Sequence, residues 1–389
     1  MMPALDISNR KRERWITAWF FILAGFLSAS WSSRIPDIQK QLNLNNAALG
    51  TVLFALPAGF IAGITVAGWL AVKYGTRTVV ISGNILASLL LITLGFAQTP
   101  LQLMIALFLA GFVRTVFNIS INTKSIEVQK LYDRPIVSMF HGLWSMACFG
   151  AAGIGTFMIV RHISPGTHFT IIGFFSLGLT VILSFFFKKN EKIPIDKRPL
   201  FVKPDRFLFL LGLIAFCVML CESTVFDWSV NYFEKVVRVQ KEYVTAGYTA
   251  FIITMATGRL TGDYFIKRFG ALTMMRFNGS LIVAGFALAV AFPYLITATI
   301  GLLLIGLGDS IMVPLAYNLS SRSTKMRPSY AIAAVTMIGY IGFLLGPVLV
   351  GFISESFGMR WAFATVGAVC LSILYISNEL KPYITKAVT

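Results

Sequence analysis

The chain has 389 residues, of which 57% are hydrophobic and 13% are charged, and its formal net charge is +17. A soluble domain cannot cover this much apolar surface, because charged residues normally occupy the outside of a fold. A hydrocarbon layer about 30 Å thick takes roughly 20 apolar residues per helical span, so twelve spans fit in the chain with short connections. The composition predicts an all-α membrane protein with twelve transmembrane helices. It favours the lipid bilayer as partner over nucleic acid, despite the positive charge.

The apolar segments follow one another in two groups of six. The first group consists of 15–36, 46–72, 79–97, 101–125, 136–160 and 168–187. The second group consists of 207–230, 243–266, 272–292, 297–319, 330–353 and 360–379. Between them, 188–206 is polar and contains three prolines. We therefore predict an N-terminal six-helix bundle at 1–187, a cytoplasmic linker at 188–206 and a C-terminal six-helix bundle at 207–389.

The Lys and Arg residues lie mainly on one side of this arrangement. If the N-terminus is cytoplasmic, 25 of them fall on the cytoplasmic side, 7 on the outer side, and Arg114 within a span. The positive-inside rule then places both termini in the cytoplasm. The first apolar run, 15–31, has the length of a span and lacks a small-residue cleavage site, so no cleaved signal peptide is expected.

The two groups of spans carry an internal repeat. The string Lys73-Tyr-Gly-Thr-Arg-Thr after the second span parallels Arg268-Phe-Gly-Ala-Leu-Thr after the eighth, at an offset of 195 residues. At the same offset, Leu109-Ala-Gly-Phe-Val-Arg114 parallels Leu304-Ile-Gly-Leu-Gly-Asp309. Both copies begin on the cytoplasmic side, so the sequence indicates parallel repeats related by an axis along the membrane normal.

Two six-helix halves, a basic central loop and the Gly/basic hairpin resemble the major facilitator superfamily over essentially the whole chain. Further strings resemble a bacterial branch that includes an uncharacterised enterobacterial inner-membrane permease and the rhizopine-locus membrane protein of rhizobia. They are Ala29-Ser-Trp-Ser-Ser-Arg-Ile-Pro36, Tyr74-Gly-Thr-Arg77, His141-Gly-Leu-Trp-Ser145, Glu222 to Trp228, Gly258-Arg-Leu-Thr-Gly262, and Gly346-Pro347 with Gly351. The fucose/glucose proton symporters are more distantly similar. The resemblance implies two pseudo-symmetric bundles, transport by alternating access, a bacterial inner-membrane location and a monomer.

Two departures from the superfamily pattern affect the expected mechanism. The hairpin pattern normally carries an Asp where this chain has Val72 and Lys267, so the usual charge relay there is in question. The Gly/Pro signature of proton antiporters is missing from the fifth span, since 150–155 contains no proline, while 342–347 in the eleventh span has one. This difference disfavours drug/proton exchange.

Charged residues within the spans are the first candidates for function, because each costs about 2.5–3.5 kcal/mol at mid-membrane on insertion scales. Glu222 lies about 15 residues into the seventh span and is the candidate proton carrier, with Asp309 as a second one. The alternative for Glu222 is a structural carboxylate bonded to a neighbouring helix. Arg114 and Asp309 occupy the same repeat position, so we predict that they pair across a central cavity or share a solute; otherwise each pairs within its own half.

Further polar residues extend the predicted cavity. Asn118 and Asn122 continue the Arg114 face of the fourth span at i+4 and i+8. Arginine and amides on one face suit a solute with hydroxyl or carboxylate groups, although amides also hold helices together. Trp31 is expected to close the cavity from the first span, unless it belongs to the interfacial aromatic belt.

Two gates are predicted from charges near the span ends. On the outer side, Arg34 and Asp227 would form a bridge beside Trp228, with interfacial charges that meet headgroups as the alternative. On the inner side, Arg259 and Asp263 stand at i and i+4 and would form a structural clamp. His141, near the inner end of the fifth span, either titrates near neutral pH or serves as a packing residue.

Other classes of function have little support in the sequence. No Walker lysine motif, zinc motif or nucleophile elbow is visible, so we expect no enzyme, no cofactor and no metal. The four cysteines lie in apolar runs and indicate core residues. We predict a secondary transporter that moves a small polar solute such as a sugar or polyol, coupled to protons. Proton-driven efflux of amphipathic compounds is the alternative, and a non-transporting membrane sensor is a distant one.

Overall fold

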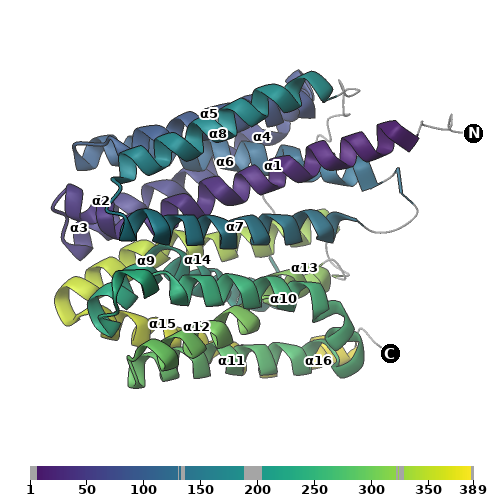
Figure 1. Ribbon diagram of the computed structural model, residues 1–389. Coiled ribbons are helices and arrows are strands. Elements are labelled where there is room, and N and C mark those ends of the chain that lie inside the picture. Colours follow the sequence, from purple (N-terminus) through teal and green to yellow (C-terminus); the bar gives the residue numbers. More distant parts are fainter. Residues whose placement is uncertain are drawn as a thin grey trace, which may run out of the picture. The chain divides into compact units, whose positions relative to one another are not determined.

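The computed structural model describes residues 7–129, 131–132, 136–187, 204–320, 323 and 328–386, and every regular element within these ranges is helical (Figure 1). The predicted linker at 188–206 lies outside these ranges except for its last three residues, so the domain boundary placed there stays a prediction. Packing divides the described residues into two compact units. Unit 1 comprises those of Met1–Leu42 and Ala55–Asp196, and unit 2 those of Asn43–Phe54 and Lys197–Thr389.

In unit 1, α1 packs against α7, α4 against α6, and α5 against both α6 and α8. The helices of this unit are α1 (Ile7–Ser33), α2 (Ile35–Gln41), α4 (Ala55–Tyr74), α5 (Thr76–Gly95), α6 (Pro100–Gln129), α7 (Val137–Val160) and α8 (Pro165–Phe186). Figure 1 shows α1, α5, α7 and α8 running lengthwise beside one another in this unit.

In unit 2, α9 packs against α14 and α15, α11 against α12 and α15, and α10 against α12. Its helices are α3 (Asn46–Leu53), α9 (Arg206–Tyr232), α10 (Ala246–Phe269), α11 (Ala271–Ala291), α12 (Leu295–Asp309), α13 (Met312–Ser320), α14 (Pro328–Phe357), α15 (Met359–Glu379) and α16 (Lys381–Lys386), with a π-helical turn at Phe233–Val237. The short α3 belongs to this unit because it packs on α14, where the Asn46 backbone N–H donates to Glu355 Oε2 at 2.8 Å.

Each of the twelve predicted spans is occupied by helix. Eleven described helical segments are long and apolar enough to cross a membrane. The eighth predicted span forms as α10, a helix of 24 residues that is not among those eleven. The reason is its composition, since α10 carries several threonines together with Arg259, Lys267 and Arg268.

Two of the predicted spans are interrupted well inside their length, which the apolar pattern did not show, whereas the first is broken only near its end, at Arg34. The second is divided at Phe54 into α3 and α4, and the tenth at 310–311 into α12 and α13. A proline follows each break by three or four residues, Pro57 in α4 and Pro314 in α13. Proline has no N–H to donate to the carbonyl four residues earlier and its ring crowds that carbonyl, so a helix bends or breaks there.

The backbone supports the repeat found in the sequence. Gly75, between α4 and α5, has φ 80° and ψ 148°, and Gly270, between α10 and α11, has φ 83° and ψ 154°. A side chain makes this conformation strained, and glycine alone adopts it readily. The same unusual turn therefore recurs at the same place in both units, 195 residues apart.

Candidate functional site

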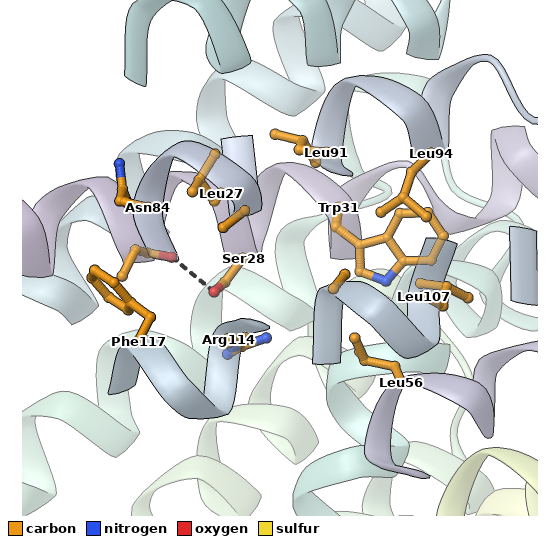
Figure 2. A pocket seen from close by; sticks show the side chains of 13 residues that line it. Leu27, Ser28, Trp31, Leu56, Asn84, Leu91, Leu94, Leu107, Arg114 and Phe117 are labelled. Carbon is orange, nitrogen blue, oxygen red and sulfur yellow. Dashed lines mark hydrogen bonds between the residues drawn. The ribbon is translucent and has the colours of Figure 1, made fainter. Parts of the chain in front are cut away.

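Unit 1 contains a pocket of about 70 Å³ formed by α1, α4, α5 and α6 (Figure 2). Most of the side chains that line it are apolar, and they come from Ala24, Leu27, Leu56, Ala87, Leu91, Leu94, Leu107, Ala110 and Phe117. The other four are Ser28, Trp31, Asn84 and Arg114. Leu94 and Leu107 appear with Trp31 toward one end of the view, and Asn84 and Phe117 toward the other. An apolar pocket with a few polar groups is typical of small-molecule binding sites.

The polar groups of this pocket differ in how they are used. Arg114 is the one charged residue among the lining side chains, and its guanidinium carbon lies 5.5 Å from the centre of the Phe60 ring. The Asn84 amide nitrogen donates to Thr180 and Ser176, at 2.6 and 3.0 Å, while its oxygen Oδ1 is buried and accepts no hydrogen bond from the described residues. The buried indole N–H of Trp31 likewise has no acceptor among them. Both of these atoms are covered by protein, so the charged group that the pocket offers is the Arg114 guanidinium.

The two amides that extend the Arg114 face do not line this pocket. Asn118 and Asn122 are half-buried on α6, and the Asn122 amide donates to the Asn118 carbonyl at 2.8 Å. That bond turns the Asn122 side chain back along its own helix. A role of either amide in a cavity shared by the two units stays a prediction.

In unit 2, three of the predicted site residues come together from three helices. Glu222 lies on α9, Arg259 on α10, and Asp309 at the end of α12. The Arg259 guanidinium Nη2 lies 3.8 Å from Glu222 Oε1, and both charges lie close enough to Asp309 to act on its carboxylate. The Tyr317 phenol of α13 is also near Glu222. The cluster therefore contains two carboxylates and one guanidinium.

The break in the tenth span positions Arg259 in this cluster. Pro314 cannot donate to the Ser310 carbonyl, and the Arg259 Nε donates to that oxygen at 3.3 Å instead. The preceding residue, Gly258, lets α10 approach the break closely, because a Cβ there would collide with the Ser310 side chain. Arg259 consequently joins the Glu222 carboxylate to the backbone of the interrupted helix.

Asp309 is the most enclosed member of the cluster. Its side chain is 2% exposed, and neither carboxylate oxygen accepts a hydrogen bond from the part of the chain that the structure describes. A buried carboxylate without donors is costly unless it is paired or protonated. Sequence reasoning selected Asp309 and Glu222 separately, and the structure brings them together with Arg259.

The predicted outer gate residues are all buried, and Arg34 has local partners. Its Nε lies 2.7 Å from Asp37 Oδ2, and its Nη2 donates to the Ile163 carbonyl at 2.6 Å. Asp227 and Trp228 are buried in α9, 7% and 0% exposed. Since Arg34 belongs to unit 1 and Asp227 to unit 2, a bridge between them stays a prediction.

At the predicted inner gate, the described partners of Arg259 are Glu222 and Ser310. Asp263 lies in α10, but its side chain is outside the described part of the structure, so the clamp with Arg259 stays a prediction. His141 is exposed on α7, and its ring lies 5.2 Å from the Phe21 ring in an edge-on contact. That contact fits the packing role that was one of the two interpretations of His141.

Sequence reasoning missed a buried ion pair in unit 1. Lys124 Nζ on α6 lies 2.9 Å from Glu13 Oε2 on α1, and the two side chains are 6% and 8% exposed. Glu127 is a second partner of Lys124 at 3.7 Å. The signal was present, since Glu13 borders the first apolar span and Lys124 lies at the end of the fourth, but Lys124 was counted only among the cytoplasmic Lys and Arg residues and Glu13 was not considered. Buried His168 was also missed, although both ring nitrogens lack hydrogen-bond partners among the described residues.

The pocket in unit 1 and the charged cluster in unit 2 use the same repeat positions. Leu27 and Arg114 line the pocket, and the residues 195 positions later are Glu222 and Asp309. Each unit therefore places a side chain from its first span and one from its fourth span in its candidate site. A two-unit bundle of long apolar helices with polar sites inside each unit is the architecture of a multi-pass membrane transporter.

Comparison with known proteins agrees with this architecture. The family model for the Major Facilitator Superfamily matches residues 15–331. An uncharacterized MFS-type transporter of Yersinia pestis is 30% identical over 358 residues, which cover 91% of this chain and 92% of the relative. The uncharacterized transporter y4wD of Sinorhizobium fredii is 31% identical over 380 residues, covering 95% and 100%.

Among solved structures, a bacterial homolog of the human lysosomal transporter Spinster, in an inward-facing and unoccupied conformation, superposes with a TM-score of 0.76. The match covers 98% of this chain and 99% of that one at 14% sequence identity, so it speaks for the fold alone. The chain belongs to the major facilitator superfamily. It is a multi-pass membrane protein and a transporter of a small-molecule solute, and the resemblance found in its sequence is confirmed.

Proposed function

We propose that this protein is a proton-coupled secondary transporter of a small polar solute, such as a sugar, polyol or related metabolite, which works by alternating access. The observation that carries the proposal is the cluster of Glu222, Arg259 and Asp309. It combines two carboxylates with one guanidinium inside a single unit, at an interrupted helix. Intramembrane ionisable groups at broken helices mark ion and substrate paths in transporters.

The formal charge of the cluster supports coupling to protons. With both carboxylates ionised, it carries one uncompensated negative charge, and with either of them protonated it is neutral. A low-dielectric interior favours the neutral state, because isolated charges are costly there. One proton bound to the Glu222/Asp309 pair thus allows the cluster to pass through a closed state without a bare charge.

Arg259 would couple protonation of the Glu222/Asp309 pair to the conformation of the interrupted helix α12–α13. It contacts the Glu222 carboxylate and donates to the Ser310 carbonyl at the break between α12 and α13. Protonation of Glu222 removes its attraction for the guanidinium, and the Arg259 side chain is then free to reorient toward Asp309 or the backbone. The break is the element whose geometry this change would bias.

The solute is proposed to contact Arg114 and the polar groups around it in unit 1. A guanidinium binds hydroxyl and carboxylate oxygens, and the Ser28, Trp31 and Asn84 side chains line the same pocket. Asn118 and Asn122 would complete this face, and Asp309 would contribute from the other half. A direct pair between Arg114 and Asp309 is part of the proposal.

The proposal also includes two gates. The outer gate would consist of Arg34, Asp227 and Trp228, and the inner gate of Arg259, Asp263 and His141.

One observation favours the second candidate, proton-driven efflux of amphipathic compounds. The pocket of unit 1 is lined mostly by leucine, alanine and aromatic side chains. Such an apolar lining suits the apolar body of an amphipathic compound. The two candidates differ in the class of solute that binds, which a binding screen resolves.

The first experiment is a thermal-unfolding screen of the detergent-purified protein. Sugars, inositols, sugar acids, amino acids and lipophilic cations are compared at about pH 5.5 and about pH 7.5. These values lie on either side of the ordinary pKa of histidine, about 6.5. A ligand at 100 times its Kd adds about 2.7 kcal/mol of stability. Stabilisation by one polar class supports the first candidate, and stabilisation by lipophilic cations alone moves the assignment to efflux.

The solute found in this way is then used in proteoliposomes with an imposed proton gradient. We expect Glu222→Gln to lower uphill accumulation by about tenfold or more while solute exchange without a gradient continues, because the neutral amide replaces only the protonated carboxyl. Glu242→Gln, at an exposed acid in the 3-10 turn Lys241–Tyr243, is the matched control and should match the wild type. Undiminished uphill uptake by Glu222→Gln would exclude Glu222 as the proton carrier.

A further inference from the structure

Unit 2 has a second cavity, a groove of about 420 Å³ between α10, α11 and the break in the tenth span. Gly258 and Gly262 form its α10 wall, and both are places where a Cβ would collide with the break, at Ser310 and Ile311. Phe265 and Phe269 lie on the same helix and Phe277 on α11, and these three lining side chains are 40–55% exposed. The groove is therefore apolar and open to the surroundings of the unit. Its floor is formed by the break between α12 and α13.

Basic residues stand directly beside groove-lining residues in the sequence: Arg268 precedes Phe269, and Arg276 precedes Phe277. Phe269 and Gly270 form the turn into α11, and the Arg268 guanidinium carbon lies 5.6 Å from the centre of the Phe269 ring. On α11, Arg276 follows the lining residue Thr273 by about one helical turn, and its buried Nε has no hydrogen-bond partner among the described residues. Residues 263–277 hold three basic residues and one acidic residue, Asp263. An anion beside Arg268 and Arg276 would meet complementary charge.

The corresponding positions in unit 1 are filled. Counting back 195 residues from Gly262, Met274 and Ile311 gives Ala67, Val79 and Val116, which form one buried hydrophobic cluster. Leu70 and Phe112, the counterparts of Phe265 and Leu307, pack against it. The groove is thus a feature of the second repeat and not a by-product of the repeat geometry.

From these observations we propose that the groove binds an anionic phospholipid from the surrounding bilayer. One acyl chain lies between α10 and α11 against the phenylalanines. The phosphate lies at the cytoplasmic end, where Arg276 and Arg268 supply the charge. A membrane-spanning protein offers such a groove to lipid at high local concentration, and basic pockets at the ends of helices select anionic headgroups. Since Ser310 and Ile311 form the inner wall, an occupying chain would also support the α12–α13 break.

The test compares lipid binding by native mass spectrometry of the detergent-purified protein. Phosphatidylglycerol and phosphatidylcholine of identical acyl chains are added separately to the wild type and to Arg276→Gln. We expect the wild type to prefer phosphatidylglycerol. Arg276→Gln should lower binding of phosphatidylglycerol by about fivefold, as expected for one basic residue near a membrane surface, and leave phosphatidylcholine unchanged.

Two further variants separate chain binding from headgroup binding. Thr261 is an exposed residue that lines the groove, so a tryptophan there would fill the groove while every basic residue stays in place. Thr261→Trp should therefore lower binding of both lipids. Lys73 is the counterpart of Arg268 in unit 1, where the hydrophobic cluster fills the space of the groove. Lys73→Gln should therefore leave the preference for phosphatidylglycerol intact.

Three results would overturn the proposal. The first is equal binding of the two lipids by the wild type, and the second is an unchanged preference in Arg276→Gln. The third is loss of preference in Lys73→Gln to the same extent as in Arg276→Gln, which would indicate general attraction to a basic surface. If a lipophilic cation binds in the groove and phosphatidylglycerol does not displace it, the groove belongs to an amphipathic solute instead.

Discussion

The two units have corresponding backbones but different distributions of charge. In unit 1, Glu13 and Lys124 form a buried ion pair between α1 and α6. The residues 195 positions later are Leu208 and Leu319, which are 0% and 4% exposed on α9 and α13, two helices that pack together. The same pair of positions therefore holds charge in one unit and aliphatic side chains in the other.

At the candidate sites, the carboxylate and the leucine are exchanged between the two units. The first-span position is Leu27 in unit 1 and Glu222 in unit 2, so here the carboxylate lies in the second unit. Unit 1 keeps its ion pair near the start of α1 and an apolar pocket further along, whereas unit 2 has leucines near the start of α9 and charge further along. We infer that the buried carboxylate of unit 1, Glu13, supports structure, whereas those of unit 2 serve proton coupling. The following experiments begin with the structural side of that division.

The largest effect is expected from Lys124→Leu. This change leaves the Glu13 carboxylate buried beside a leucine, and breaking a buried ion pair costs about 3–5 kcal/mol. The free energy of unfolding in mild detergent, measured by urea titration, should fall by that amount.

The double variant Glu13→Leu with Lys124→Leu installs in unit 1 the residues that unit 2 already has. Replacement of a whole buried pair by apolar residues is often neutral or stabilising, so most of the loss should be recovered. If the double variant is as unstable as Lys124→Leu alone, the pair has a role that the leucines of unit 2 do not reproduce, and the proposed equivalence of these positions fails.

The next effect concerns how closely the helices cross in unit 1. Gly111 on α6 faces α4, where a Cβ would collide with the Leu56 carbonyl, and Gly59 on α4 would collide with the Phe108 carbonyl. Gly111→Val should therefore lower the free energy of unfolding by about 1–3 kcal/mol, the usual cost of overpacking. Gly153→Ala on α7 is the matched control, because nothing lies within 4 Å of an added Cβ there, and it should be neutral or slightly stabilising. Equal losses in both variants would indicate a general need for glycine rather than close crossing.

Much of the fold could be predicted from the sequence, because apolar span length and the positions of Lys and Arg are imposed by the bilayer. The predicted span at 207–230 became α9, Arg206–Tyr232, and the span at 360–379 became α15, Met359–Glu379. The offset of 195 residues was also readable, and the matching turns at Gly75 and Gly270 support it. The breaks were missed because hydropathy averages over them, although Pro57 and Pro314 gave a local signal.

The partners of the charged residues were harder to predict. Sequence spacing suggested Asp263 for Arg259 through an i, i+4 contact, which stays a prediction. It did not anticipate that Glu222 and the Ser310 carbonyl would contact the Arg259 guanidinium. For Arg34 it suggested Asp227 of the other unit, a pairing that stays a prediction, and it did not anticipate the local ion pair with Asp37. Which residues meet depends on the rotation of each helix about its axis, and that rotation is set by packing of residues such as Gly258 that spacing alone does not reveal.

The smallest effect concerns the same crossing in unit 2, where Thr254 and Gly306 take the places of Gly59 and Gly111. The Thr254 hydroxyl lies 2.8 Å from the Leu303 carbonyl of α12, while its own helix offers the Ala250 carbonyl at 2.9 Å. Because one hydroxyl proton is shared between these acceptors, Thr254→Val should cost only about 0.6 kcal/mol, the average for interhelical bonds of this kind.

Thr257→Val is its matched control, since that hydroxyl donates only along its own helix, to the Ile253 carbonyl at 2.8 Å, and its loss should be smaller still. Gly59→Thr would not recreate the interhelical bond in unit 1, because its Cβ would first meet the Phe108 carbonyl. A larger loss in Thr254→Val than in Thr257→Val would therefore show that unit 2 holds this crossing with a hydrogen bond where unit 1 uses close backbone contact. Equal losses would mean that both crossings depend on the glycine of the fourth span in each repeat, Gly111 and Gly306, and that the polar contact adds nothing.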